Sequence, residues 1–77
     1  MAKITVYSTP TCMWCRKVKS YFKEHNIPFK DYDVSSNQEK AQEMVRKSGQ
    51  MGVPVIIIDN SVIVGFDKNK IDNLLGL

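Results

Sequence analysis

Both cysteines of this chain lie in one short segment, residues 12–15 (CMWC), and this segment constrains the fold more than any other. It follows an apolar run at residues 4–7 and opens an amphipathic segment that extends to about His25. This pattern predicts a strand, a tight loop and a helix whose N-terminus carries a cysteine. A thiol there meets unpaired backbone N–H groups and the positive end of the helix dipole, which both favour the thiolate. We therefore expect Cys12 to be a reactive nucleophile.

Size and composition predict one small cytoplasmic domain. At 77 residues, with 43% hydrophobic and 25% charged residues, the chain resembles ordinary soluble proteins, and we expect residues 1–77 to form a single domain. No apolar run approaches the roughly 20 residues that span a membrane. The N-terminus enters a strand pattern without the apolar region of a signal peptide. In the cytoplasm, a Cys-x-x-Cys pair is more often catalytic or metal-binding than structural.

The net charge of +3 is unevenly distributed, because the lysines and arginines of residues 1–30 greatly outnumber the acidic residues there. Arg16, Lys17 and Lys19 directly follow the cysteine pair. They could hold a thiolate, attract an anionic partner, or simply form a solvated helix face. The chain has no dense basic run and no repeated aromatic–basic pattern, so we do not expect it to bind nucleic acid.

Four strands are expected. Alternating polar and apolar residues predict strands at 3–7 and, more weakly, at 29–34. The most apolar run, at residues 55–58, predicts a central strand that is covered on both faces. Asp59-Asn60 then indicates a hairpin turn into a strand at 61–64.

Three helices are expected between and after these strands. The second is predicted to begin with a capping box from Ser36 to Glu39 and to end at Gly49. Asp67 is a plausible N-cap for the third. The residues expected on the buried faces are, helix by helix, Trp14, Val18, Tyr21 and Phe22; Ala41, Met44 and Val45; and Ile71, Leu74 and Leu75.

The element order is therefore β-α-β-α-β-β-α. A strand–helix–strand unit requires parallel strands with a right-handed crossover, whereas the second half of the chain ends in an antiparallel hairpin. A four-stranded mixed sheet with helices on both faces satisfies both conditions, so the expected fold class is α/β.

Taken together, these features resemble a glutaredoxin of the thioredoxin fold over essentially the whole chain. The CMWC motif lies between the first strand and the first helix, and Val53-Pro54 begins the third strand, where the family carries a cis-proline beside the active site. Gly65-Phe66-Asp67 is similar to the segment with which glutaredoxins hold glutathione. The segments VYSTPTC (residues 6–12) and GQMGVPV (residues 49–55) are most similar to those of small bacterial glutaredoxin-like redoxins.

The resemblance implies a thiol–disulfide oxidoreductase that needs no bound cofactor. Cys12 would attack a substrate disulfide, and Cys15 would resolve the mixed disulfide, leaving a disulfide between Cys12 and Cys15. The implied partners are protein disulfides or glutathione mixed disulfides, with glutathione as the reductant or co-substrate.

Two departures from the family pattern lead to a second interpretation. The commonest glutaredoxin motif is Cys-Pro-Tyr-Cys, and many members carry a lysine three residues before the first cysteine. This chain has Met13, Trp14 and Thr9 at those positions. It is closer there to redoxins that are reduced by a flavoprotein of the thioredoxin-reductase type and serve ribonucleotide reductase. Some relatives have selenocysteine at the first motif position, where this chain has Cys12.

A metal site would need more ligands than this chain supplies in one motif. Two cysteines cannot complete a four-ligand site, so we expect no metal within the chain. A third interpretation is a scaffold that holds an iron–sulfur cluster between two protomers through Cys12 and glutathione, which the lack of a proline at Met13 leaves open. No surplus apolar stripe stands out, so we expect a monomer.

Four residues are candidates for substrate contact near the first thiol. Val53 and Pro54 are expected to share a cis peptide bond and to turn backbone groups toward an extended substrate segment. Trp14 would contact partner proteins or simply cover the thiol pair. Thr11 would hydrogen-bond near the thiolate or cap the helix.

The segment after the fourth strand supplies the remaining candidates. Gly65 would allow close approach of the backbone, and N–H groups at the start of the last helix would bind a carboxylate. Asp67, next to Phe66, would take the ammonium of a γ-glutamyl group. The alternative is a simple turn in which Asp67 is only the N-cap of the helix.

Overall fold

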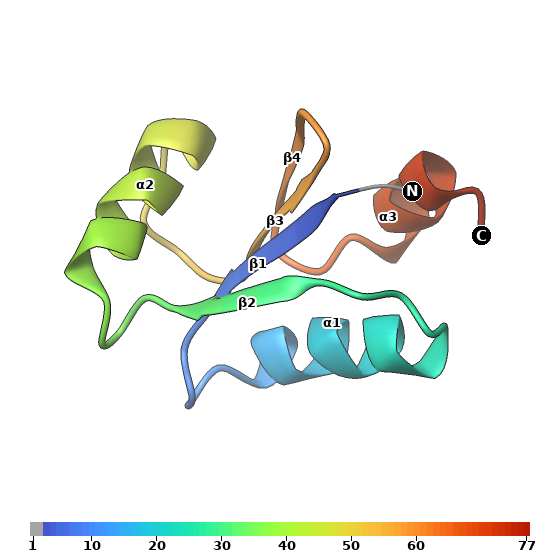
Figure 1. Cartoon of the computed structure of the whole chain (residues 1–77), viewed down its shortest axis with the longest axis horizontal. Helices are drawn as coiled ribbons and strands as arrows, with labels where there is room; N and C mark the ends of the chain where they lie inside the picture. The colour runs from blue at the N-terminus through green and yellow to red at the C-terminus, as the bar shows by residue number, and fades with distance from the viewer. Residues whose placement is uncertain (1–2) are drawn as a thin grey trace.

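The computed structural model describes residues 3–77, which form a mixed sheet and three helices (Figure 1). In chain order the elements are β1 (Ile4–Ser8), α1 (Met13–Glu24), β2 (Lys30–Asp33), α2 (Gln38–Ser48), β3 (Val55–Ile58), β4 (Ser61–Val64) and α3 (Lys68–Leu75). This is the predicted order of strands and helices.

The sheet has the strand order β2-β1-β3-β4. β1 is parallel to β2 and antiparallel to β3, and β3 is antiparallel to β4. Every residue of β3 is buried, which confirms the prediction of a central strand. α1 and α3 pack against one face of the sheet and α2 packs against the other (Figure 1). The α/β fold class with helices on both faces is thereby confirmed.

The hydrophobic core has two layers, because neighbouring residues of a strand point to opposite faces of the sheet. The layer under α2 contains Met44, Tyr7, Val55 and Ile57. The layer under α1 and α3 consists of Ile4, Val6, Val18, Phe22, Ile56, Ile58, Ile63 and Ile71. A fully buried side chain of this kind contributes about 1.5–3 kcal/mol through the hydrophobic effect.

The predicted buried faces of α1 and α3 are each wrong at one residue. In α1 the fully buried positions are Cys15, Val18 and Phe22, whereas Trp14 is 56% exposed. The helix is therefore rotated so that the second cysteine, not the tryptophan, faces the sheet. In α3 Ile71 is buried, but Leu74 is 42% exposed.

The strand bounds also differ slightly from the prediction. β1 extends to Ser8, and β2 covers Lys30–Asp33 rather than 29–34. β2 is an edge strand that pairs only with β1, so its length follows the four residues of β1 opposite it. Phe29 precedes the strand, yet its ring lies 5.5 Å from that of Phe22 and extends the core.

The N-cap of α2 is Asn37 and not Ser36, so the predicted capping box is wrong. The Asn37 side chain accepts a hydrogen bond from the Lys40 backbone N–H at 3.1 Å. Three residues of similar capping preference precede this helix, and local sequence does not decide which one adopts the cap geometry. The predicted end is confirmed, because Gly49 adopts the left-handed conformation at the C-cap, with a φ of 75°.

This cap can be tested by substitution. We expect Asn37→Ala to lower the free energy of unfolding by about 1 kcal/mol, because it leaves a backbone N–H of the first turn without its partner. Ser36→Ala should change it by less than about 0.5 kcal/mol, as an exposed substitution without such a role. Urea denaturation of both variants makes the comparison. A larger loss for Ser36→Ala would contradict the assignment.

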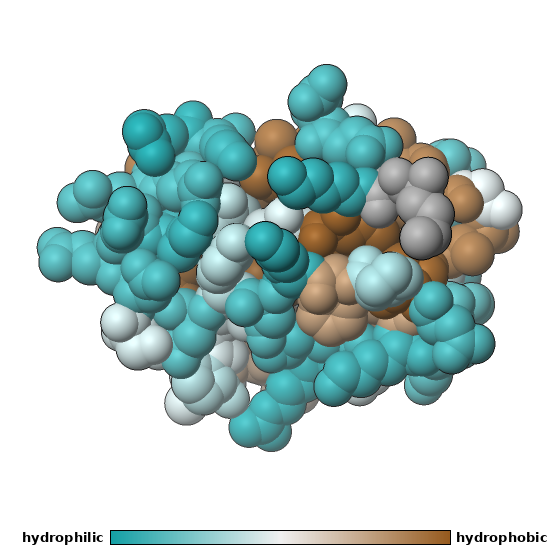
Figure 2. All heavy atoms as spheres, viewed as in Figure 1, coloured by the Kyte–Doolittle hydropathy of each residue, from teal (hydrophilic) through white to brown (hydrophobic). Residues whose placement is uncertain are grey.

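The surface differs between the two halves of the molecule. Hydrophilic side chains cover α2, while apolar side chains show mainly over the half that holds α3 (Figure 2). Within residues 3–77, no helix has the length and apolar character needed to cross a membrane.

Candidate active site

Cys12 is the N-cap of α1. Its backbone is extended, and its Sγ accepts a hydrogen bond from the Cys15 backbone N–H at 3.1 Å. The sulfur thus takes the place of a capping oxygen, and a negative charge on it is stabilised by this N–H and by the helix dipole. The side chain is only partly buried. Thr11 is exposed and lies one residue before the N-cap, so the prediction that it caps the helix is wrong.

Cys15 has the opposite environment. It lies in the first turn of α1 and is fully buried. Burial, followed by its hydrogen bond with Cys12, raises the pKa of the Cys15 thiol to about 11. An incoming disulfide can therefore reach Cys12 but not Cys15, and Cys15 can react only with a sulfur already placed at Cys12.

The segment that precedes β3 lies beside the first thiol. The Val53–Pro54 peptide bond is cis, as predicted. The Val53 carbonyl oxygen lies 3.9 Å from the Cys12 Sγ, and Pro54 is buried. Two segments that are 41 residues apart in the chain thus meet at the thiol.

A groove of about 220 Å³ runs next to this junction and is lined by Trp14, Val53, Pro54, Gly65 and Phe66. It gathers five of the seven residues predicted to contact substrate. Gly65 has a φ of 81°, which favours glycine, and its N–H donates to the Pro54 carbonyl at 2.8 Å. This bond ties the end of β4 to the Val53–Pro54 segment, and residues of both segments line the groove.

Thr11 and Asp67 are not among the residues that line this groove. The Asp67 side chain accepts a hydrogen bond from the Lys70 backbone N–H at 3.2 Å and is the N-cap of α3. The predicted cap is confirmed, while contact of Asp67 with glutathione stays a prediction.

The three cations after the cysteine pair have different neighbours. Arg16 donates to the Pro10 carbonyl at 3.0 Å and so braces the loop before the thiol. The Lys17 ammonium lies 4.4 Å from the centre of the Trp14 ring, a cation–π contact that steadies the exposed indole. Lys19 instead turns toward the sheet, where it forms an ion pair with Asp31 at 2.9 Å.

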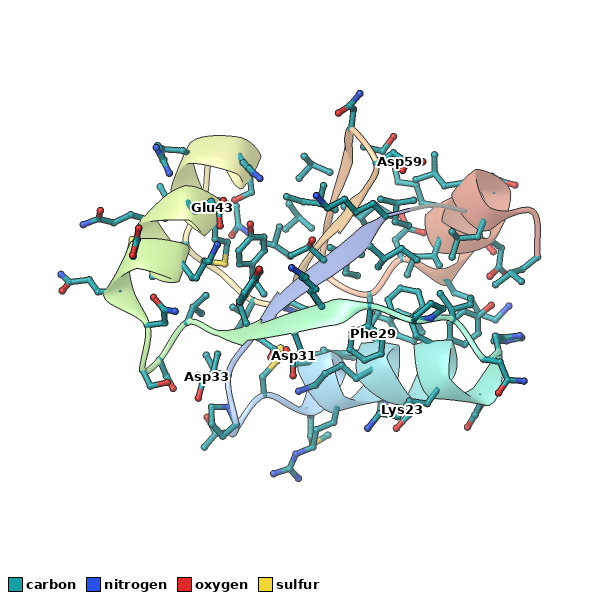
Figure 3. The ribbon with its side chains drawn as sticks, in the orientation of Figure 1. Lys23, Phe29, Asp31, Asp33, Glu43 and Asp59 are labelled. Carbon is teal, nitrogen blue, oxygen red and sulfur yellow. The ribbon has the colours of Figure 1, made fainter. Side chains whose placement is uncertain are left out.

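Ser8 and Asp31 form a polar cluster with Lys19 of α1, and sequence reasoning missed both. Ser8 is buried, donates to Asp31 Oδ1 at 2.6 Å and accepts from Lys19 Nζ at 3.4 Å. Asp31 lies between β2 and the first turns of α1 (Figure 3). One signal was available: Ser8 continues the inward alternation of Ile4 and Val6, so a polar side chain there needs a partner.

The described residues offer no set of metal ligands. Within residues 3–77, no group of three or more His, Cys, Asp or Glu side chains is placed to hold a metal ion.

Known proteins that resemble this chain carry the same kind of domain. The family model for glutaredoxin matches residues 4–63. An uncharacterized glutaredoxin-like protein encoded in the rubredoxin operon of Clostridium pasteurianum is 51% identical over 72 residues, covering 94% of this chain and 96% of its own. Glutaredoxin 3 of Escherichia coli is 33% identical, with 87% and 81% covered. The glutaredoxin-like protein NrdH of Lactococcus lactis is 31% identical, with 92% and 97% covered.

Solved structures agree with the sequence relatives. Methanoredoxin of Methanosarcina acetivorans superposes with a TM-score of 0.89 at 26% identity, covering 97% of this chain and 85% of its own. The NrdH-redoxin of Escherichia coli gives 0.83 at 26% identity, with 94% and 93% covered. The Cys-x-x-Cys turn presents one reachable and one buried thiol. The fold and the relatives agree with this arrangement. The chain belongs to the glutaredoxin family and is a thiol–disulfide oxidoreductase.

Proposed function

We propose that this protein reduces protein disulfides by a dithiol mechanism, with Cys12 as the nucleophile and Cys15 as the resolving thiol. The observation that carries the proposal is the contrast between the two sulfurs. Cys12 Sγ is reachable and accepts the Cys15 N–H at 3.1 Å, whereas Cys15 is fully buried. Only the first can meet an external disulfide.

The reaction has two exchange steps. The Cys12 thiolate attacks one sulfur of the substrate disulfide, and the other sulfur leaves as a thiolate and takes a proton from water. Cys15 then loses its proton and attacks the Cys12 sulfur of the mixed disulfide, which releases the second substrate thiol. Two electrons have passed to the substrate, and the protein holds a disulfide between Cys12 and Cys15.

The groove supports an extended segment of a protein as the substrate. It is lined by apolar side chains and by glycine, with no charged side chain among its lining residues. A peptide segment on either side of a disulfide could lie between Trp14 and Phe66 while its sulfur reaches Cys12. The exposed indole of Trp14 offers the largest apolar contact on the rim.

For the reductant we propose glutathione, with a flavoprotein disulfide reductase as the second candidate. Gly65, Phe66 and Asp67 support glutathione through their similarity to the family's glutathione segment. The flavoprotein is favoured by Thr9, an uncharged residue where many glutaredoxins carry a lysine, and by the similarity to NrdH proteins along nearly their full length.

A direct test uses Trp14, the one tryptophan of the chain. Oxidised protein is mixed with millimolar reduced glutathione at neutral pH, and tryptophan fluorescence follows its reduction. Fast and complete reduction would support glutathione as the donor. If glutathione fails, but a thioredoxin-reductase-type flavoprotein with its nicotinamide donor reduces the protein rapidly, the second candidate holds. Failure of both donors would contradict the proposal.

A further inference from the structure

In the second exchange step a negative charge develops on the Cys15 sulfur, and the buried position of this sulfur disfavours that charge. Cys15 is fully buried, and burial is the main reason that its pKa is raised to about 11. At neutral pH a buried thiol of this kind is almost entirely protonated. The resolving step therefore gains strongly from any group that stabilises the charge developing on this sulfur.

Lys19 is placed to do so. It lies four residues after Cys15 in α1, so the two side chains are on the same face of the helix, one turn apart. Its ammonium does not extend into solvent, because it is held at 2.9 Å from Asp31 and at 3.4 Å from the buried Ser8 hydroxyl. The Lys19 side chain is 24% exposed, so its charge is only partly screened.

The Lys19–Asp31–Ser8 cluster joins α1, β2 and β1. Ser8 ends β1 and adjoins Thr9, whose backbone N–H lowers the pKa of Cys15, as does the Lys19 charge. Asp31 contributes from β2, pointing into the space between that strand and α1 (Figure 3). Its two oxygens are both occupied, one by the Ser8 hydroxyl and the other by Lys19.

Other charges bear on this arrangement. Asp31 carries the opposite charge of the ion pair, but it is the more exposed partner, at 38% against 24% for Lys19. A thiolate at Cys12 opposes a second negative charge at Cys15 and raises its pKa, but this opposition ends once Cys12 is in a mixed disulfide. Asp33, at the end of β2, accepts hydrogen bonds from the backbone and hydroxyl of Ser35 in its own loop. On the face of α1 that packs against the sheet, Lys19 thus supplies the positive charge that favours the Cys15 thiolate.

We propose that Lys19, held by Asp31 and Ser8, promotes the resolving step by stabilising the negative charge on Cys15 as it attacks the mixed disulfide. The proposal rests on the roles of the two cysteines given above. In this step the Cys15 proton passes to water, the bond between the Cys15 and Cys12 sulfurs forms, and the substrate sulfur leaves with an electron pair and takes up a proton. Lys19 is not consumed and acts through Cys15, as a positioning residue.

The two steps can be timed separately with the aromatic disulfide dithiobis(nitrobenzoic acid), because each thiolate that leaves is coloured. The first equivalent of colour reports attack by Cys12 and depends on reagent concentration. The second reports resolution by Cys15 and does not. Stopped-flow traces over a range of pH give a rate and a pH profile for each step.

We expect Lys19→Gln to slow the second phase about tenfold at neutral pH and to raise the midpoint of its pH profile by about one unit, while the first phase keeps its rate. Lys19→Met, which keeps the apolar stem of the side chain, should behave alike. Lys19→Arg retains the charge and should restore most of the rate. The matched control is Lys23→Gln, an exposed lysine one turn further along α1 (Figure 3), with both phases unchanged.

Two outcomes would overturn the inference. One is a second phase in Lys19→Gln and Lys19→Met with the parent's rate and pH profile. The other is an equal slowing of both phases, which would indicate a general structural effect. Failure of the proposed function would look different, because the parent protein itself would then release one equivalent only, or Cys15→Ser would still release two.

Discussion

Cys12→Ser is expected to abolish disulfide reduction, with a loss of about a thousandfold or more in rate. A serine hydroxyl does not ionise near neutral pH and cannot form the mixed disulfide. The fold should be retained, because serine is a preferred N-cap residue and can accept the same N–H of Cys15. Reduction of a protein disulfide, followed by mass spectrometry of the substrate, measures the loss.

Cys15→Ser is the matched control for this result. It should still attack the substrate and accumulate as a mixed disulfide at Cys12, since the nucleophile and its position are unchanged. Substantial reductase activity in Cys12→Ser, with no mixed disulfide in Cys15→Ser, would reverse the roles of the two cysteines.

Phe22→Ala should have the largest effect on stability, with a loss of about 3–5 kcal/mol. The Phe22 ring is fully buried in the core layer between α1 and the sheet and packs on Phe29. A chain of this size has a free energy of unfolding of roughly 4–12 kcal/mol, so the variant should be close to unfolding. Urea denaturation of the reduced protein gives the difference.

Leu74→Ala serves as the comparison for the core substitution. Leu74 is 42% exposed although the sequence pattern placed it on the buried face of α3, and its removal should cost less than about 1 kcal/mol. Equal losses for Phe22→Ala and Leu74→Ala would contradict the described packing of α1 and α3.

Features that depend on local sequence could be predicted well. The thiol at a helix start, the apolar central strand at 55–58 and the caps at Gly49 and Asp67 each follow from a few neighbouring residues. The groove joins segments that lie far apart in the chain, and its residues were predicted because Val53-Pro54 and Gly65-Phe66 resemble a family pattern rather than from periodicity.

Features that depend on packing or register could not be predicted in this way. The rotation of α1, which buries Cys15 and exposes Trp14, is set by how the helix docks on the sheet. The bond from Ser8 to Asp31 depends on the pairing of β1 with β2, in which Ser8 and Asp31 point to the same face. Neither docking nor register is visible in a window of ten residues.

The most direct test of the site is the relative reactivity of its two thiols. Reduced protein is treated briefly with a limiting amount of iodoacetamide at neutral pH, and tandem mass spectrometry locates the modified cysteine. The geometry predicts alkylation at Cys12 with Cys15 unmodified, because only the Cys12 sulfur is reachable and accepts a backbone N–H at the start of α1. Alkylation of Cys15 at an equal or greater rate would contradict the assignment of nucleophile and resolving thiol.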